Sequence, residues 1–343
     1  MATILKPLTN NDIATTKTLL HEAIPLTGTI VSGTYASDGN IKNYSHGMFQ
    51  AVYDYPFLSS SANHIFDLTV GYSSNSSLAG AASVQNSKKI NIYNQMSQVL
   101  VGYDASGQIQ DFDRDGDIVA GGTKHTECIF INLARLLTKD EIKKQSFVFQ
   151  FFSDGTPVAP TTPLTISDYG AANEYRTSSP AGDYGILYTG SAAVEGTGVG
   201  LLYYQAGIAV LTASIVAGAF GPPAATFDTS SIAAVLTGSA ISASCDGIRN
   251  KWQDLDFNNT TELNSTIYFC RANHSEFNYS ANPTYLSASK IFVKETMLDA
   301  PITYVTSVGL YGADNELLAT AKLSEPLKKT PQTELTIRVR LDY

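Results

Sequence analysis

Charged residues are scarce in this chain of 343 residues. Asp, Glu, Lys and Arg make up 15% of it, whereas soluble proteins average about 25%. A surface with so few charges carries little electrostatic repulsion against association. The 19 tyrosines supply a residue type that protein interfaces favour. The composition therefore favours a protein that packs against other subunits, and the alternative is an extracellular monomer with a coat rich in Ser and Thr.

A concentrated basic patch is also missing. The formal net charge is −9, and the most basic stretches are three isolated lysine pairs at 88–89, 143–144 and 328–329. Nucleic acid and anionic membrane surfaces are both bound through clustered cations, so we expect neither as a direct partner. The first twelve residues lack a basic start followed by an apolar run, and the longest apolar stretch, 207–220, is short and rich in Gly and Ala. We therefore expect no signal peptide, no membrane insertion and synthesis in a cytoplasm.

The sequence lacks the motifs of common catalytic and zinc sites. The three cysteines (Cys128, Cys245, Cys270) fit no disulfide or metal framework and are expected to be reduced and buried. The five histidines are scattered without zinc spacing, and no nucleophile elbow or phosphate loop is present. We expect no enzyme and no cofactor. Two carboxylates for sugar hydrolysis can meet in space without a sequence signature, so a glycan-degrading enzyme stays open as an alternative.

One acidic motif has the pattern of a cation-binding loop. Carboxylates alternate along the segment and a glycine stands at its sixth position, Gly116, as in loops that direct oxygen ligands toward Ca²⁺. The candidate metal ligands are Asp111, Asp113, Asp115 and Asp117. The usual Glu at the twelfth position is absent, because Gly122 stands there. A structural Ca²⁺ is therefore one hypothesis, and a solvated acidic turn that ends a hairpin is the other.

Strand patterns dominate the chain. Runs of β-branched and aromatic residues, bounded by Gly, Asn and Ser, predict strands over 26–31, 65–70, 146–152, 184–188, 199–204 and 208–212. The last two are expected to form a hairpin. Runs at 302–311, 317–322 and 334–341 predict an antiparallel C-terminal meander, since the last of them alternates strictly.

Helical patterns are fewer. Apolar residues at helical spacing predict helices over 89–101 and 133–144, with shorter ones near 229–236 and 248–255. The expected fold class is α+β and strand-rich, with antiparallel sheets and a few short helices. A stretch rich in Pro, Gly, Ser and Thr, 156–180, predicts a linker or long loop between an N-terminal strand-rich domain, 1–155, and a C-terminal β-rich domain, 181–343.

Several segments resemble virion structural proteins of contractile-tailed phages, the myoviruses, especially those of marine cyanobacteria. These segments are 54–64 (DYPFLSSSANH), 89–96 (KINIYNQM), 134–144 (ARLLTKDEIKK), the hairpin 199–212 and the C-terminal stretch 323–343. The pattern of 308–311 and 317–323 also resembles β-hairpins of phage tail and fibre-attachment proteins. The resemblance brings no catalytic residues with it.

The resemblance implies a structural component of a virion, made in the host cytoplasm. The position expected first is the tail, at the baseplate or its fibre network, and the alternatives are the neck or collar and the capsid surface. Its partners would be other virion proteins and copies of itself, in a homo-oligomer whose ring or trimer symmetry follows the tail. Tyr53, Tyr55, Tyr169 and Tyr175 are the expected interface anchors. A module that binds host glycans or a receptor is the alternative of another class.

Overall fold

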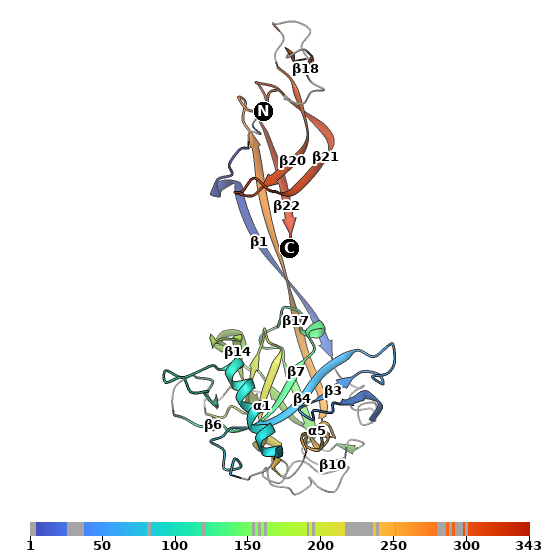
Figure 1. Cartoon of the computed structure of the whole chain (residues 1–343), viewed down its shortest axis with the longest axis vertical. Helices are drawn as coiled ribbons and strands as arrows, with labels where there is room; N and C mark the ends of the chain where they lie inside the picture. The colour runs from blue at the N-terminus through green and yellow to red at the C-terminus, as the bar shows by residue number, and fades with distance from the viewer. Residues whose placement is uncertain are drawn as a thin grey trace. The chain divides into compact units, whose positions relative to one another are not determined.

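The computed structural model of the chain forms two compact units (Figure 1). The structure describes residues 5–25, 38–80, 84–117, 121–152, 155–156, 159–160, 163–190, 192–193, 196–216, 236–237, 240–250, 252–279, 286–287, 290–291, 298 and 301–343. The larger unit comprises 20–261, and the smaller unit comprises 1–19 together with 262–343. Two strands, β1 (Ile13–Pro25) and β17 (Trp252–Ala272), each have residues in both units.

Antiparallel strands build the larger unit. Its strands follow the order β1-β17-β9-β12-β14-β15-β16-β7-β4-β3-β2, with β13 paired to β14 and β8 paired to β17. Their bounds are β2 (Ile41–Asn43), β3 (Gln50–Tyr53), β4 (His64–Tyr72), β7 (Glu127–Leu133), β8 (Glu141–Ile142), β9 (Val148–Phe152), β12 (Pro163–Ser167), β13 (Arg176–Ser179), β14 (Gly182–Thr189), β15 (Gly200–Tyr203) and β16 (Ile208–Thr212). Two short pairs stand apart from this path, β5 (Phe112–Asp113) with β6 (Lys124–His125) and β10 (Gly155–Thr156) with β11 (Ala159–Pro160).

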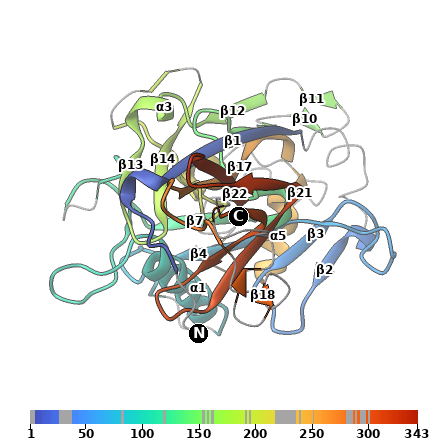
Figure 2. The ribbon, with the colours of Figure 1, turned by 90° about the horizontal axis from the view of Figure 1, so that it is seen from above.

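Helices cover part of this sheet. The helical elements described in the unit are α1 (Val84–Leu100), α2 (Arg135–Thr138), α3 (Ala171–Glu174), α5 (Ile241–Asn250) and the 3-10 turns η2 (Asp38–Asn40) and η3 (Ala213–Val216). Helix α1 lies beside β4 in both views (Figure 1 and Figure 2). The approach is close because Gly71 has no side chain: a Cβ there would lie 2.7 Å from the carbonyl oxygen of Lys89.

The core of the larger unit contains an aromatic cluster. Phe66 of β4 and Trp252 of β17 stack with ring centroids 4.4 Å apart and planes inclined by 4°. Phe149 of β9 completes the cluster, with its centroid 4.3 Å from that of Trp252. Large buried aromatic side chains contribute much of the apolar burial that stabilises a domain. The cluster therefore ties strands β4, β9 and β17 together.

The smaller unit is made of strands with few helical residues. Its described elements are η1 (Asn10–Asp12), the first part of β1, the second part of β17, β18 (Leu286–Ser287), β19 (Lys290–Ile291), β20 (Thr303–Tyr311), β21 (Leu317–Lys329) and β22 (Leu335–Asp342). β22 pairs antiparallel with β17, while β20 and β21 form a separate antiparallel pair. Figure 1 shows this pair curving beside β17 and β22. β17 has 21 residues, far more than the 3 to 10 residues of most strands.

The strand-rich α+β prediction is confirmed, as is the hairpin of β15 and β16. Its turn uses Gly207 at φ 68°, a left-handed conformation that glycine adopts without strain. The helix predicted over 89–101 is present as α1, although Val99 of its predicted apolar stripe is 63% exposed. The strand predicted over 26–31 lies outside the described residues, as does nearly all of the helix near 229–236.

Three local predictions were wrong. The helix predicted over 133–144 is only α2, because Lys139 takes a φ of 56° and 141–142 pair with β17. The helix near 248–255 is instead the end of α5 and the start of β17, where Trp252, Leu255 and Phe257 are buried. The C-terminal meander does not form, because β22 pairs with β17 and not with β21.

The two units also differ from the predicted domains 1–155 and 181–343. The segment 156–180, predicted as a linker or long loop, contains β12, α3 and β13. β12 lies between β9 and β14 in the sheet, and Ile166 is buried there. Pairing with distant strands therefore determines the structure of this segment more than its turn-forming composition does.

No helix of the described residues is long and apolar enough to cross a membrane.

Candidate functional site

The acidic motif lies on and after β5, in the larger unit. Asp113 pairs in register with Lys124 of β6, and its buried carboxylate forms an ion pair with the Lys124 ammonium group. The backbone N–H of Asp115 donates a hydrogen bond of 2.7 Å to Oδ1 of Asp113. Gly116 then turns the chain at φ 65°. Because Lys124 supplies the positive charge next to Asp113, this carboxylate already has a counter-charge from the protein.

The other acidic residues of the motif contact different parts of the unit. Asp111 accepts hydrogen bonds from the Ser73 hydroxyl at 2.6 Å and from the Asn75 amide at 2.8 Å. Asp115 accepts a hydrogen bond of 2.9 Å from the backbone N–H of Gly196.

Asp117, the last of the four predicted ligands, is exposed. Across the part of the chain that is described, no group of three or more His, Cys, Asp or Glu side chains is arranged to hold a metal ion. The turn is not fully solvated, because Asp113 is buried. The Ca²⁺ hypothesis and its alternative both stay predictions.

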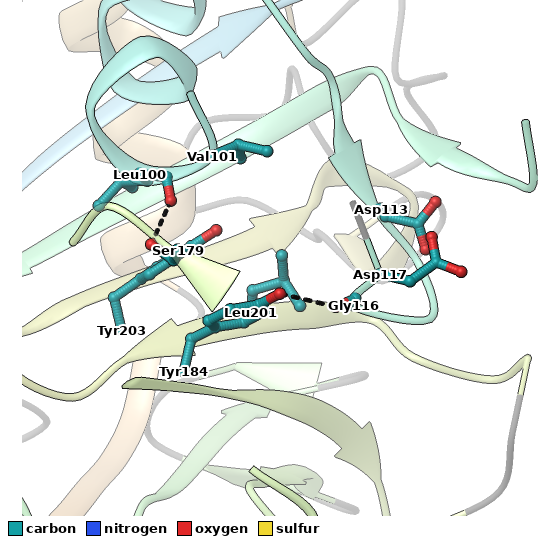
Figure 3. Close-up of a pocket in the computed structure, with 9 residues that line it drawn as sticks. All are labelled: Leu100, Val101, Asp113, Gly116, Asp117, Ser179, Tyr184, Leu201 and Tyr203. Atoms are coloured by element: carbon teal, nitrogen blue, oxygen red, sulfur yellow. Dashed lines mark hydrogen bonds between the residues drawn. The ribbon is translucent and has the colours of Figure 1, made fainter. Parts of the chain in front are cut away.

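A small cavity adjoins this turn (Figure 3). Its volume is about 10 Å³, which is room for about one water molecule. Asp113 and Asp117 lie at one end, and Tyr184 donates a hydrogen bond of 2.9 Å to the Gly116 carbonyl oxygen. Burial raises the pKa of the Tyr184 hydroxyl, which is therefore neutral at physiological pH. The cavity is too small for an organic substrate.

The histidines are spread through both units and contact different groups. His64 lies 2.8 Å from Asp67, His21 lies 3.1 Å from the Thr260 hydroxyl, and His274 lies 3.3 Å from Glu334. His125 is buried, and burial lowers its pKa to about 4, so it is neutral at physiological pH. These contacts are those of single structural histidines.

The predicted tyrosine anchors lie in the larger unit and differ in exposure. Tyr55, Tyr169 and Tyr175 are 56%, 45% and 39% exposed, whereas Tyr53 is half-buried beside Phe57. Lys144 lies over the Tyr175 ring at 4.5 Å from its centroid. Three of the four side chains are therefore accessible to another protein.

The described strands of the smaller unit expose many apolar side chains. Among its described residues, Val339 is the one apolar side chain that is buried, at 7% exposure. Large apolar side chains are exposed along its strands, namely Ile13, Leu19, Leu263, Tyr304, Tyr311, Leu317, Leu318 and Leu327. A soluble unit of about 100 residues normally buries a substantial core. The described strands of this unit therefore lack a closed core within a single chain, and large exposed apolar surfaces mark interaction sites.

Comparison of the chain with known protein families, with curated proteins and with solved structures found no match. The smaller unit's open surface was not assigned from the sequence, although a signal for it was present. The last run, 334–341, alternates strictly between apolar and polar residues. That pattern predicts a half-buried sheet but leaves open what covers its apolar face.

Proposed function

We propose that this chain is a structural, non-catalytic component of a tailed-phage virion, at the tail baseplate or in its fibre network. The observation that carries the proposal is the smaller unit, whose described strands leave nearly all of their apolar side chains partly or fully exposed. Such a unit becomes stable when another subunit covers it, as in obligate assemblies. The low content of charged residues, 15%, supports the same role.

The phage assignment rests on the resemblance of segments such as 54–64 and 134–144 to myovirus virion proteins. In this role the larger unit, with its aromatic cluster around Trp252, provides a rigid body. The exposed Tyr55, Tyr169 and Tyr175 provide contacts to neighbouring virion proteins.

The test is immunogold labelling of purified myovirus particles with an antibody against this protein. Gold at the baseplate or fibres is the expected result. Gold at the neck or on the capsid would support a virion component and overturn the tail position. Intact and disrupted particles that both remain unlabelled, while denatured pure protein is recognised, would overturn the virion assignment.

A further inference from the structure

Two sheet faces of the smaller unit are apolar and incompletely covered. The first is formed by β17 and β22, where Tyr268 lies opposite Val339 and Cys270 lies opposite Ile337. Because side chains alternate along strands, these four project from one face of the strand pair. All except Val339 are partly accessible in the single chain.

The second face belongs to the hairpin of β20 and β21. Val308 lies opposite Ala321, and Leu310 lies opposite Ala319. All four are partly accessible. Each pair combines a large side chain with a small one, so the surface alternates between ridges and hollows. Such a surface can interdigitate with an identical one, because the large residue of one copy fits over the small residue of another.

The charges of the smaller unit indicate what kind of partner fits. The unit contains ten acidic and ten basic residues, so its formal net charge is zero, and the net charge of −9 belongs to the larger unit. Its charges also pair within the unit, as in Lys17 with Glu262 and Arg271 with Asp12. A partner of opposite net charge is therefore not required. An identical neutral unit meets no net repulsion here.

In the part of the smaller unit that the structure describes, the outer edges of the β1–β17–β22 sheet have no further partner strand. Among the described strands of the smaller unit, β1 and β22 each pair with β17 alone. Unpaired edges and an incompletely covered apolar face together are a liability for a free monomer, which proteins remove by covering them. A copy of the same chain is always synthesised together with it, whereas a different partner would leave these surfaces exposed until it arrived.

We propose that a second copy of this chain covers the smaller unit, closing over the apolar faces of the β17–β22 pair and the β20–β21 hairpin in a closed homo-oligomer. This inference rests on the proposed structural function and specifies its first partner. The apolar core that the described strands of the unit lack in a single chain then forms between copies, and folding of the unit is coupled to association.

The test compares the mass in solution of the full chain with that of three variants, by light scattering on a size-exclusion column. Ile337→Glu places a charge on the apolar face of β22. Thr336→Glu is the matched control, because Thr336 is exposed on the opposite face of the same strand and lies opposite Arg271. Ile337→Val keeps the face apolar. Fluorescence of Trp252, the one tryptophan of the chain, reports whether the larger unit stays folded.

The native chain, Thr336→Glu and Ile337→Val are expected at an integer multiple of 36.7 kDa greater than one. Ile337→Glu is expected at the monomer mass with native Trp252 fluorescence. A native chain that stays monomeric at high micromolar concentration would overturn the proposal, as would an Ile337→Glu oligomer identical to the native one. The immunogold experiment gives an independent result. If the protein is monomeric in solution but is found in virions, the proposed function stands and the self-association is wrong. If the protein is oligomeric but absent from virions, the self-association stands and the proposed function is wrong.

Discussion

Val339 on β22 lies directly opposite Tyr268 on β17, and it is the one buried apolar side chain among the described residues of the smaller unit. In the larger unit the same strand β17 contributes Trp252, which is buried between Phe66 and Phe149. One strand therefore takes part in a closed core at one end and in an open sheet at the other. The contrast is the physical basis of the proposed assembly.

The stack of Phe66 on Trp252 is expected to stabilise the larger unit. Phe66→Leu keeps an apolar side chain but removes the ring, so the free energy of unfolding should fall by about 1–2 kcal/mol. Urea denaturation followed by Trp252 fluorescence measures the change. The control is Leu58→Ala, since Leu58 is 88% exposed, and its effect should stay within about 0.5 kcal/mol. Equal effects of the two substitutions would contradict the importance of the stack.

Asp168 makes the stability of the larger unit depend on pH. Burial raises the pKa of its carboxyl group from 3.8 to about 6, although Gln145, Phe147 and Tyr204 donate hydrogen bonds that favour the ionised form. The folded state therefore binds the proton more tightly than the unfolded chain. As the pH rises from 3.8 to about 6, the contribution of Asp168 to the free energy of unfolding should fall by roughly 3 kcal/mol.

The measurement is urea denaturation of the native chain and of Asp168→Asn from about pH 4 to about pH 7. Asparagine cannot ionise. Its amide NH₂ group also replaces one of the two Asp168 oxygens that accept hydrogen bonds, so this variant should be less stable than the native chain at every pH. The difference in stability between native and variant should nevertheless shrink as the pH rises. A difference that is constant over the whole range would show that Asp168 does not titrate with a raised pKa.

Lys124 is expected to be essential for the acidic turn. Lys124→Met leaves the buried Asp113 carboxylate without its counter-charge, which should lower the free energy of unfolding by about 2–4 kcal/mol. The double variant Asp113→Asn, Lys124→Met removes both charges and should recover part of the loss. Thermal denaturation of the native chain, of Lys124→Met, of Asp113→Asn and of the double variant measures this coupling. Additive effects of the two substitutions would mean that the ion pair contributes nothing.

Calcium is expected to have no effect on the stability of the native chain. The carboxylates of Asp111, Asp113 and Asp115 accept hydrogen bonds from protein donors in different places. Thermal denaturation with a chelator and with added Ca²⁺ should therefore give the same midpoint, and calorimetric titration should be flat. Heat of binding that disappears in the Asp113→Ala, Asp115→Ala variant would instead establish the Ca²⁺ site.

Thiol reactivity reports on the open face of the smaller unit. Cys128 and Cys245 are fully buried, and burial raises the pKa of each thiol, so both should react only after unfolding. Cys270 lies on the apolar face of β17 and is partly exposed in the single chain. In the oligomer its reaction with a thiol reagent should be slow, and in Ile337→Glu it should be fast. Rapid labelling of Cys270 in the native oligomer would place the interface elsewhere.

Local patterns predicted the strand-rich class, helix α1 and the hairpin of β15 and β16, because each depends on residues close in sequence. The predictions from sequence were wrong where pairing with a distant strand determines the local structure. The run at 141–142 pairs with β17, and β22 pairs with β17 and not with its neighbour β21. The alternation at 334–341 likewise predicted a strand with one apolar face. It could not show that this face is incompletely covered in the single chain, because burial of a face depends on which other elements pack against it.

The most direct test of the account is hydrogen–deuterium exchange of the full chain, measured in the oligomer and after dilution has dissociated it. We expect the amides of β20, β21 and β22 to exchange slowly in the oligomer and at nearly the rate of an unfolded chain after dissociation, while β4 and β7 stay protected throughout. Equal protection of β20, β21 and β22 in monomer and oligomer would contradict the account, because the smaller unit would then be stable without a second copy.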